Sequence, residues 1–159
     1  MPIKDVLLGL TTYPDPTPSA AVVQAVAFAE AVGSKISALA VEVRFQLPGH
    51  IPFLSSALVD IPGLVAGEQG RSIDNATALL ECFETEARKR DVLREARRDR
   101  CLSHEVPDMM AERARYSDLT LCPILNGETG IAEAVIFGSG RPALLIPAGR
   151  SSKPITLNK

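Results

Sequence analysis

The sequence predicts an α/β fold, a three-layer α/β/α domain with a five-stranded, mostly parallel sheet. Short apolar and β-branched runs alternate along the chain with longer runs whose apolar residues recur at helical spacing. This alternation favours parallel strands joined by right-handed crossovers, which place helices on both faces of the sheet. The 159 residues suffice for one such domain with its own core.

The first half of the chain supplies two strands and a helix. Residues 3–12, IKDVLLGLTT, predict an apolar strand suited to burial on both faces. Residues 19–32 predict a helix that is apolar around most of its circumference, with Thr17 as its N-cap and Gly33 at its end. Residues 35–43 alternate and carry β-branched side chains, which is typical of a strand.

Residues 45–72 form an unusual segment that is apolar yet contains three prolines and four glycines. A structureless loop of this length would be rare in a compact domain. We therefore expect a short helical turn near residues 53–59 and then a long helix, clearest from Ile73 to Arg90. The apolar stretch 51–66 has three interpretations: a lid over the protein's own core, a cover for a crevice, or part of an interface.

The second half adds three strands and two helices. The charged run at residues 91–103 predicts an edge strand, because charge at a sheet edge discourages unwanted pairing. Leu93 and Cys101 are expected on one face of it. The other predicted elements are a helix over 104–117, a strand over 118–124, a helix over 130–138 and a strand over 142–147. We expect one domain over residues 1–150 and a flexible tail over 151–159.

Composition argues against several classes of function. The net charge of −2 gives no general attraction to nucleic acid or to an anionic membrane. The basic run over residues 88–100 is interrupted by acidic residues and lacks aromatic side chains for base stacking. No apolar run approaches the ~20 residues that span a bilayer, and the first residues do not resemble a signal peptide. These features predict a soluble, cytoplasmic protein. The isolated Cys82, Cys101 and Cys122 predict reduced thiols, with neither a disulfide nor a zinc site.

The second half resembles the universal stress protein family. The resemblance lies in ARYSDLTLCPI, a glycine-containing loop and AEAVIFGSGRPALLIP, of which GSGRPALLIP is the most specific part. The opening strand, alanine-rich helix and second strand match the family in order and length. The resemblance implies the strand order 3-2-1-4-5, and a homodimer with a role in stress tolerance.

ATP-binding members of that family share a Gly-2x-Gly-9x-Gly-(Ser/Thr) motif after the fourth strand and an Asp that ends the first. Here Gly127 and Gly130 have the two-residue gap, and Gly138 with Ser139 forms the closing pair. Seven residues, not nine, separate Gly130 from Gly138. Two fewer residues rotate the end of a helical segment by about 200°. Thr11 stands where the family's binders carry Asp.

The glycine motif could bind phosphate, but acidic side chains beside it would disfavour that binding. Backbone N–H groups of a glycine-rich turn and the start of a helix can hold phosphate. Glu128 within the turn and Glu133 in the first helical turn would compete for that place. The glycines also have a structural interpretation, in which Gly127 and Gly130 serve the turn while Gly138 and Gly140 end the helix.

Little in the sequence indicates catalysis. The run Gly138-Ser139-Gly140 is not a nucleophile elbow, since it follows a helix instead of a strand. The two histidines, His50 and His104, have no partner that the sequence selects. We therefore expect no catalytic residue and no metal.

The last strand predicts an interface. Its apolar edge invites pairing with another strand, and Pro142 and Pro147 limit the length of that pairing. A two-fold dimer, in which each copy covers the edge of the other, resolves the exposure. The predicted interface residues are Ala143, Leu144, Leu145 and Ile146.

The favoured function is a non-catalytic, cytoplasmic, homodimeric stress-response module that acts through a protein partner or a bound small molecule, with no cofactor expected. The alternative is an ATP-binding protein of the same type, and a weaker alternative is a nucleotide hydrolase on the same scaffold. The candidate nucleotide crevice comprises Gly9, Thr11, Val41, Gly127, Gly130, Gly138 and Ser139.

Overall fold

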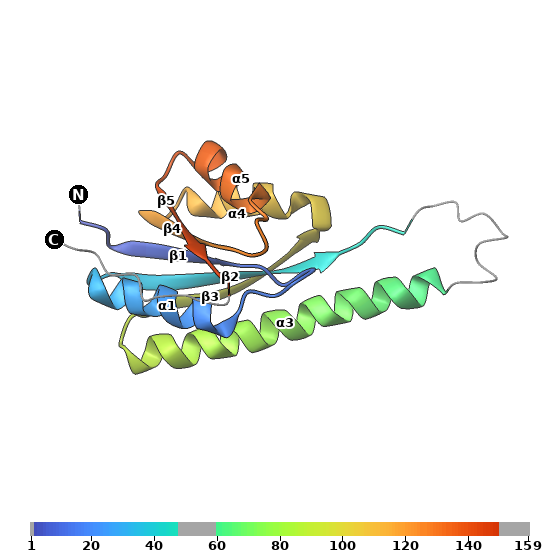
Figure 1. The fold of residues 1–159 in the computed structure, drawn as a ribbon, viewed down its shortest axis with the longest axis horizontal. Coiled ribbons are helices and arrows are strands. Elements are labelled where there is room, and N and C mark those ends of the chain that lie inside the picture. The colour runs from blue at the N-terminus through green and yellow to red at the C-terminus, as the bar shows by residue number, and fades with distance from the viewer. Residues whose placement is uncertain (1, 48–59, 150–159) are drawn as a thin grey trace.

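The structure is a computed structural model that describes residues 2–47 and 60–149. Its centre is a five-stranded sheet in the order β3-β2-β1-β4-β5, and every neighbouring pair is parallel. Helices α1 and α3 cover one face, and α4 and α5 cover the other (Figure 1). The predicted three-layer architecture and strand order are therefore confirmed. The tail over 151–159 and the helical turn expected near 53–59 lie outside the described residues.

The strands and helices follow one another in the predicted order, and their bounds are close to the predicted ones. The strands are β1 (Asp5–Leu10), β2 (Lys35–Arg44), β3 (Leu93–Leu102), β4 (Leu119–Ile124) and β5 (Ala143–Pro147). The helices are α1 (Ser19–Ala31), α3 (Ile61–Lys89), α4 (Val106–Ala114) and α5 (Gly130–Ser139), with a short 3-10 turn, η1 (Ser103–Glu105), before α4.

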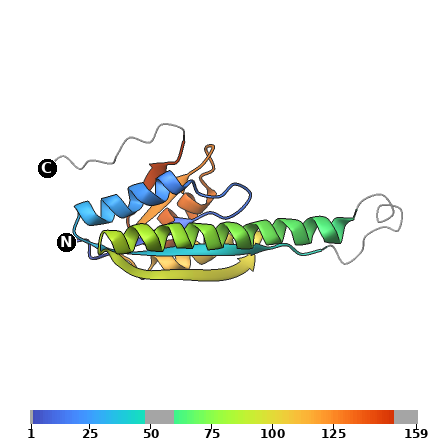
Figure 2. The same ribbon diagram turned by 90° about the horizontal axis from the view of Figure 1, so that it is seen from below.

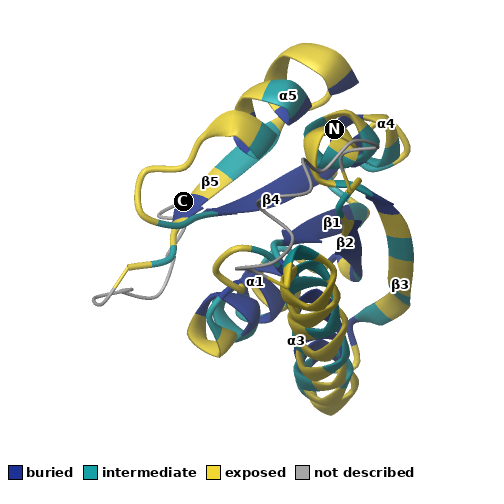
Figure 3. Cartoon of the chain, turned by 90° about the vertical axis from the view of Figure 1, so that its right-hand side faces the viewer, coloured by how far each residue is buried: buried dark blue, intermediate teal, exposed yellow. Residues whose placement is uncertain are grey.

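The core forms in two layers because the central strands are buried on both faces. Val6, Leu8 and Leu10 of β1 face α1 and α3, whereas Leu7 between them belongs to the layer beneath α4 and α5. Figure 3 shows β1, β2 and β4 buried almost throughout, while β3 carries exposed bands. Since β1 has a parallel neighbour on each side and a helical layer on each face, only its ends reach the surface.

Charged side chains of the edge strand β3 form hydrogen-bonded ion pairs with the neighbouring strand β2. Glu42 of β2 is 3% exposed and accepts hydrogen bonds from Arg98 at 2.9 Å and from Arg100 at 2.8 Å. Two arginines around one buried carboxylate supply the pairing that a buried charge requires. The basic run therefore serves the sheet, in keeping with the predicted polar edge strand.

The facing predicted for β3 is wrong at its start. The register shifts between Ile36 and Ser37 of β2, which pair with Leu93 and Glu95. This bulge reverses the alternation. Leu93 therefore packs against the layer beneath α1 and α3, whereas Cys101 lies in the layer beneath α4 and α5.

Thr17 has a different role from the predicted one. The N-cap of α1 is Pro18, and no side chain caps this helix. Thr17 instead closes the turn after β1: its hydroxyl accepts a hydrogen bond from the Thr11 N–H at 2.9 Å, and its own N–H donates to the Thr11 carbonyl at 2.9 Å. A threonine turned back toward β1 cannot also cap the helix that follows.

The prediction that Gly33 ends the first helix is confirmed, since Gly33 has φ +69° directly after the end of α1.

Helix α3 begins twelve residues before the clearest part of the predicted helix, and its first turns run beyond the sheet (Figure 1, Figure 2). Its N-cap is Asp60, whose carboxylate accepts a hydrogen bond from the Gly63 N–H at 3.0 Å. Glycines at 63, 67 and 70 weaken the helical pattern in the sequence, which is why the predicted long helix is clearest only from Ile73. No helix of the described residues combines the length and the apolar character that crossing a bilayer requires.

A buried polar cluster ties the end of β1 to β2 and α3. The Thr12 hydroxyl donates to the Val41 carbonyl at 2.6 Å and lies 2.8 Å from the Ser72 hydroxyl. The Ser72 oxygen accepts from the Val43 N–H at 2.9 Å, and the Asn75 amide donates to the Thr12 carbonyl at 2.9 Å. These bonds satisfy polar groups that would otherwise be costly to bury, and they fix the direction in which the chain leaves β1.

Candidate functional site

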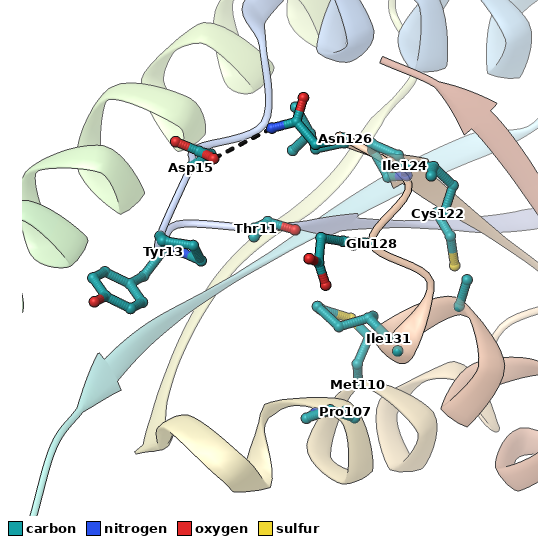
Figure 4. Close-up of a pocket in the computed structure, with 16 residues that line it drawn as sticks. Thr11, Tyr13, Asp15, Pro107, Met110, Cys122, Ile124, Asn126, Glu128 and Ile131 are labelled. Atoms are coloured by element: carbon teal, nitrogen blue, oxygen red, sulfur yellow. Dashed lines mark hydrogen bonds between the residues drawn. The ribbon is translucent and has the colours of Figure 1, made fainter. Parts of the chain in front are cut away.

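A cavity of about 310 Å³ opens at the carboxyl ends of β1 and β4 (Figure 4). Strand order reverses here, because the chain places β2 on one side of β1 and β4 on the other. In open α/β sheets, ligands bind beyond the carboxyl ends of strands at such a reversal. The volume lies at the lower end of the ~300–1,000 Å³ typical of small-molecule sites. We call this cavity the crevice.

The floor of the crevice is apolar. It is built from Gly9 of β1, Cys122 of β4, Met110 of α4, and Ile131 and Ala132 of α5. A Cβ at Gly9 would lie 3.0 Å from the Met110 sulfur, so any larger residue there would require the flexible end of Met110 to shift. Burial raises the pKa of the Cys122 thiol to about 11, which keeps it protonated and a poor nucleophile at neutral pH.

The turn after β1 forms one rim. Thr11, Tyr13 and Asp15 line the crevice from this turn. The paired bonds between Thr11 and Thr17 close the turn. The Tyr13 ring packs edge-on against Phe45, with 4.8 Å between ring centroids. This rim is therefore anchored at both of its ends.

The loop from β4 to α5 forms the opposite rim. Asn126 and Gly127 adopt positive φ angles of 49° and 78°, and the Glu128 N–H donates to the Leu125 carbonyl at 2.8 Å. This turn directs the Glu128 side chain toward the crevice, between Thr11 and Ile131 (Figure 4). An asparagine or glycine suits such a turn because positive φ costs them least.

A hydrogen bond joins the two rims. The Asn126 amide donates to the Asp15 carboxylate at 3.4 Å, a long bond at the exposed mouth (Figure 4). Asp15 and Glu128 are the acidic residues of the lining, and no Lys, Arg or His is among the described residues that line it. The crevice therefore has an apolar floor and a negatively charged mouth.

Cations lie instead at the far end of α5. Arg115 donates to the Gly138 carbonyl at 3.0 Å, and Arg141 donates to the Arg115 carbonyl at 3.2 Å. Arg115 thus serves the carboxyl end of α5, where positive charge complements the helix dipole. Arg141 instead bonds the carboxyl end of α4, because Arg115 is the C-cap residue of that helix. Arg141, the cation nearest the glycine-rich loop in the sequence, is held away from the crevice.

The structure brings together three of the predicted site residues. Gly9, Thr11 and Gly130 line the crevice. Gly138 and Ser139 do not, because they end α5, about 12 Å along the helix from Gly130 at ~1.5 Å per residue. The Ser139 hydroxyl accepts a hydrogen bond from the Arg141 N–H at 3.0 Å, which is a structural role.

Two further predicted positions lie outside the lining. Val41 is buried, and its carbonyl is taken up by Thr12. Gly127 shapes the turn through its positive φ. Sequence reasoning missed Pro107 and Met110 of α4 as lining residues. Nothing in the local pattern of α4 could have identified them, since its packing beside α5 is a long-range contact.

The predicted interface strand is an edge of the sheet, but its residues are not equally available. Leu145 is 43% exposed, and Ala143 and Leu144 are half-buried. The Ile146 side chain is 1% exposed and packs in the protein's own core, so at this residue only the backbone is available for pairing. Alternation along β5 turns Ile146 inward and Leu145 outward. The neighbouring helix α5 adds Phe137, which is 85% exposed.

No protein-family model matches the sequence, and no curated protein matches it. Solved structures do. A protein of the universal stress protein family from Burkholderia pseudomallei is 20% identical with a TM-score of 0.62, covering 92% of this chain and 97% of its own. A universal stress protein family protein from Arabidopsis thaliana with AMP bound is 14% identical with a TM-score of 0.56, covering 92% and 93%.

A universal stress protein in complex with cAMP is also similar. It is 14% identical with a TM-score of 0.54, and the match covers 94% of this chain and 100% of that one. Together these similarities show that the chain has the universal stress protein fold.

The buried Cys122 predicts a loss of stability at high pH. Below pH 9.0 the thiol is protonated in both states; between 9.0 and about 11 the unfolded chain loses the proton first. The free energy of unfolding should therefore fall between pH 9 and pH 11, by about 2–3 kcal/mol for a pKa raised from 9.0 to about 11. Urea unfolding at pH 8 and pH 10.5 should show this extra fall in the wild type and not in Cys122→Ala. Equal falls in the two proteins would contradict the assignment.

Proposed function

We propose that this chain, which has the universal stress protein fold, is a non-catalytic stress-response module that acts by binding a small molecule in the crevice. The observation that carries the proposal is the crevice itself, a cavity of about 310 Å³ with an apolar floor at the strand reversal. Two structural neighbours were solved with AMP or cAMP. They support the use of this fold for small ligands, although a fold alone does not determine a ligand.

The alternative, a nucleotide in the crevice, is favoured by those two complexes and opposed by the charges of this chain. Phosphate needs converging N–H donors and a cation. Here Glu128 and Asp15 lie at the mouth, whereas Arg115 and Arg141 bond helix-end carbonyls and do not line the crevice. The Gly138-Ser139 pair, which would close a phosphate loop, also lies at that end. We therefore propose that ATP and AMP do not bind.

The non-catalytic role is supported by the chemistry of the lining. Catalysis by a nucleophile needs an activating base within hydrogen-bond reach. The Cys122 thiol has a raised pKa because it is buried. Among the described lining residues no histidine is present to activate it. His104 lies in η1 and is exposed, and His50 lies outside the described residues.

We further propose a homodimer through the β5 edge. The backbone of an edge strand offers unpaired N–H and C=O groups to a second copy. Leu145 of β5 and Ile136 and Phe137 of α5 are the large apolar side chains exposed on these two elements. A two-fold axis beside β5 would bury Leu145 together with the open edge.

Ligand binding has a direct test. Protein purified from its source is denatured, and the released compounds are identified by mass spectrometry, with a bovine serum albumin sample as background. We expect one organic compound near equimolar amount and no adenine nucleotide. Calorimetric titration with ATP and AMP, each with magnesium, should give no binding heat because the mouth is anionic. Micromolar affinity for either nucleotide would replace this proposal with the alternative.

The stress role is tested in cells. A strain of the source organism that lacks the gene should grow normally in rich medium but survive starvation or oxidant exposure less well. Complementation with the wild-type gene should restore survival. Survival equal to that of the parent strain under a broad set of stresses would remove the stress-response part of the proposal.

The dimer is tested by light scattering after gel filtration at micromolar concentration. The wild type should have twice the mass of the chain, because the apolar edge is covered only in a pair. Leu145→Lys should shift the mass toward the monomer by placing two like charges across the axis. Leu64→Lys is the matched control, since Leu64 is 61% exposed on α3, away from β5. A monomeric wild type would disprove the interface.

A further inference from the structure

We propose that the ligand of the crevice is a small organic cation, a compact apolar molecule that carries one protonated amine. The inference rests on the proposed small-molecule function of the crevice and specifies which ligand it takes. It starts from a carboxylate of this region that has no hydrogen-bond or ion-pair partner among the described residues.

That carboxylate is Glu128. Glu42, by comparison, is held by two arginines, and Glu133 accepts a hydrogen bond from the Thr129 hydroxyl at 2.5 Å. Among the described residues, no side chain or backbone donor meets the Glu128 carboxylate, which belongs to an exposed residue at the mouth of the crevice (Figure 4). Asp15 on the facing rim accepts a hydrogen bond from the Asn126 amide at 3.4 Å and from no other residue that the structure describes. A ligand with an N–H donor and a positive charge would give both carboxylates a hydrogen bond and a countercharge.

The sum of charges also favours a cation. The start of α5 contributes about half a positive charge, which by itself would attract an anion. Asp15 and Glu128 contribute two full negative charges at the same mouth, and no described lining residue is basic. The net field is therefore negative, so a phosphate or carboxylate ligand would be repelled and an ammonium group attracted.

The floor determines the rest of the ligand. Met110, Cys122, Ile131 and Ala132 present carbon and sulfur, and Met110, Cys122 and Ala132 are buried side chains that water reaches poorly. An apolar body gains by displacing water from such a surface. At about 310 Å³ the crevice has room for a ring with a short chain and not for an extended cofactor. The amine would then lie at the mouth, near Glu128.

The experiment compares three probes of defined charge: 2-phenylethylamine, its neutral isostere 2-phenylethanol, and AMP. Binding is followed by NMR through the methyl signals of Met110 and Ile131, which report the crevice itself. Each probe is titrated into the wild type, Glu128→Gln and Glu81→Gln. Glu81 is exposed on α3, so this variant makes the same change away from the crevice.

We expect the amine to shift both methyl signals and to bind more tightly than the alcohol, with little effect of AMP. Glu128→Gln should weaken amine binding about three- to fivefold, the size typical of a partly exposed ion pair, and leave the alcohol unchanged. Glu81→Gln should change neither. Added salt should weaken the amine and not the alcohol.

Other outcomes distinguish a wrong ligand charge from a crevice that binds no ligand. If the alcohol binds as tightly as the amine, or Glu128→Gln has no effect, the cation inference is wrong while the crevice remains a ligand site. If AMP shifts the methyl signals more strongly than the amine does, the site prefers an anion and the inference is overturned. If none of the three probes shifts them, the cation inference is wrong for apolar amines. The proposed function fails as well if the denatured protein also releases no compound.

Discussion

The central position of β1 constrains everything else in this molecule, because the strand has a parallel partner on each side and a helical layer on each face. Its polar backbone is satisfied by β2 and β4, and its side chains fill both core layers. Only its carboxyl end is left open. The turn that follows is fixed by Thr17 and by the buried bonds of Thr12 and Ser72. The crevice exists because these bonds hold that turn away from the start of α5.

Charge is distributed along α5 in the sense that its dipole favours, and this distribution decides what the crevice can attract. Arginines gather at the carboxyl end, where Arg115 bonds the Gly138 carbonyl, and carboxylates gather at the amino end. Such an arrangement stabilises the helix whether or not a ligand is present. It also uses the positions from which a phosphate would have to be held. The same residues thus support the fold and set the sign of the field at the mouth.

The fold was predictable from the sequence because its signals are local. The short apolar run over 3–12 and the longer apolar run over 19–32 are local signals of a buried strand and a buried helix. The closing GSGRPALLIP indicates the end of the fold by its resemblance to the family. The crevice was predictable only in part. Gly9, Thr11 and Gly130 follow from their places in the topology, whereas Met110 enters through the packing of α4, which no local pattern reports. The bulge in β3 and the inward turn of Ile146 likewise depend on contacts between distant segments.

The contact between Gly9 and Met110 makes part of the floor compliant. Met110 is an unbranched thioether with several rotatable bonds, lying over a strand position that has no side chain of its own. Its tip can shift with little strain, so the contour beneath a bound molecule can adapt to molecules of somewhat different outline. A surface of this kind discriminates poorly by shape. Selectivity in this protein would then come from the sign of a guest's charge, so that one chain could respond to a group of chemically related compounds.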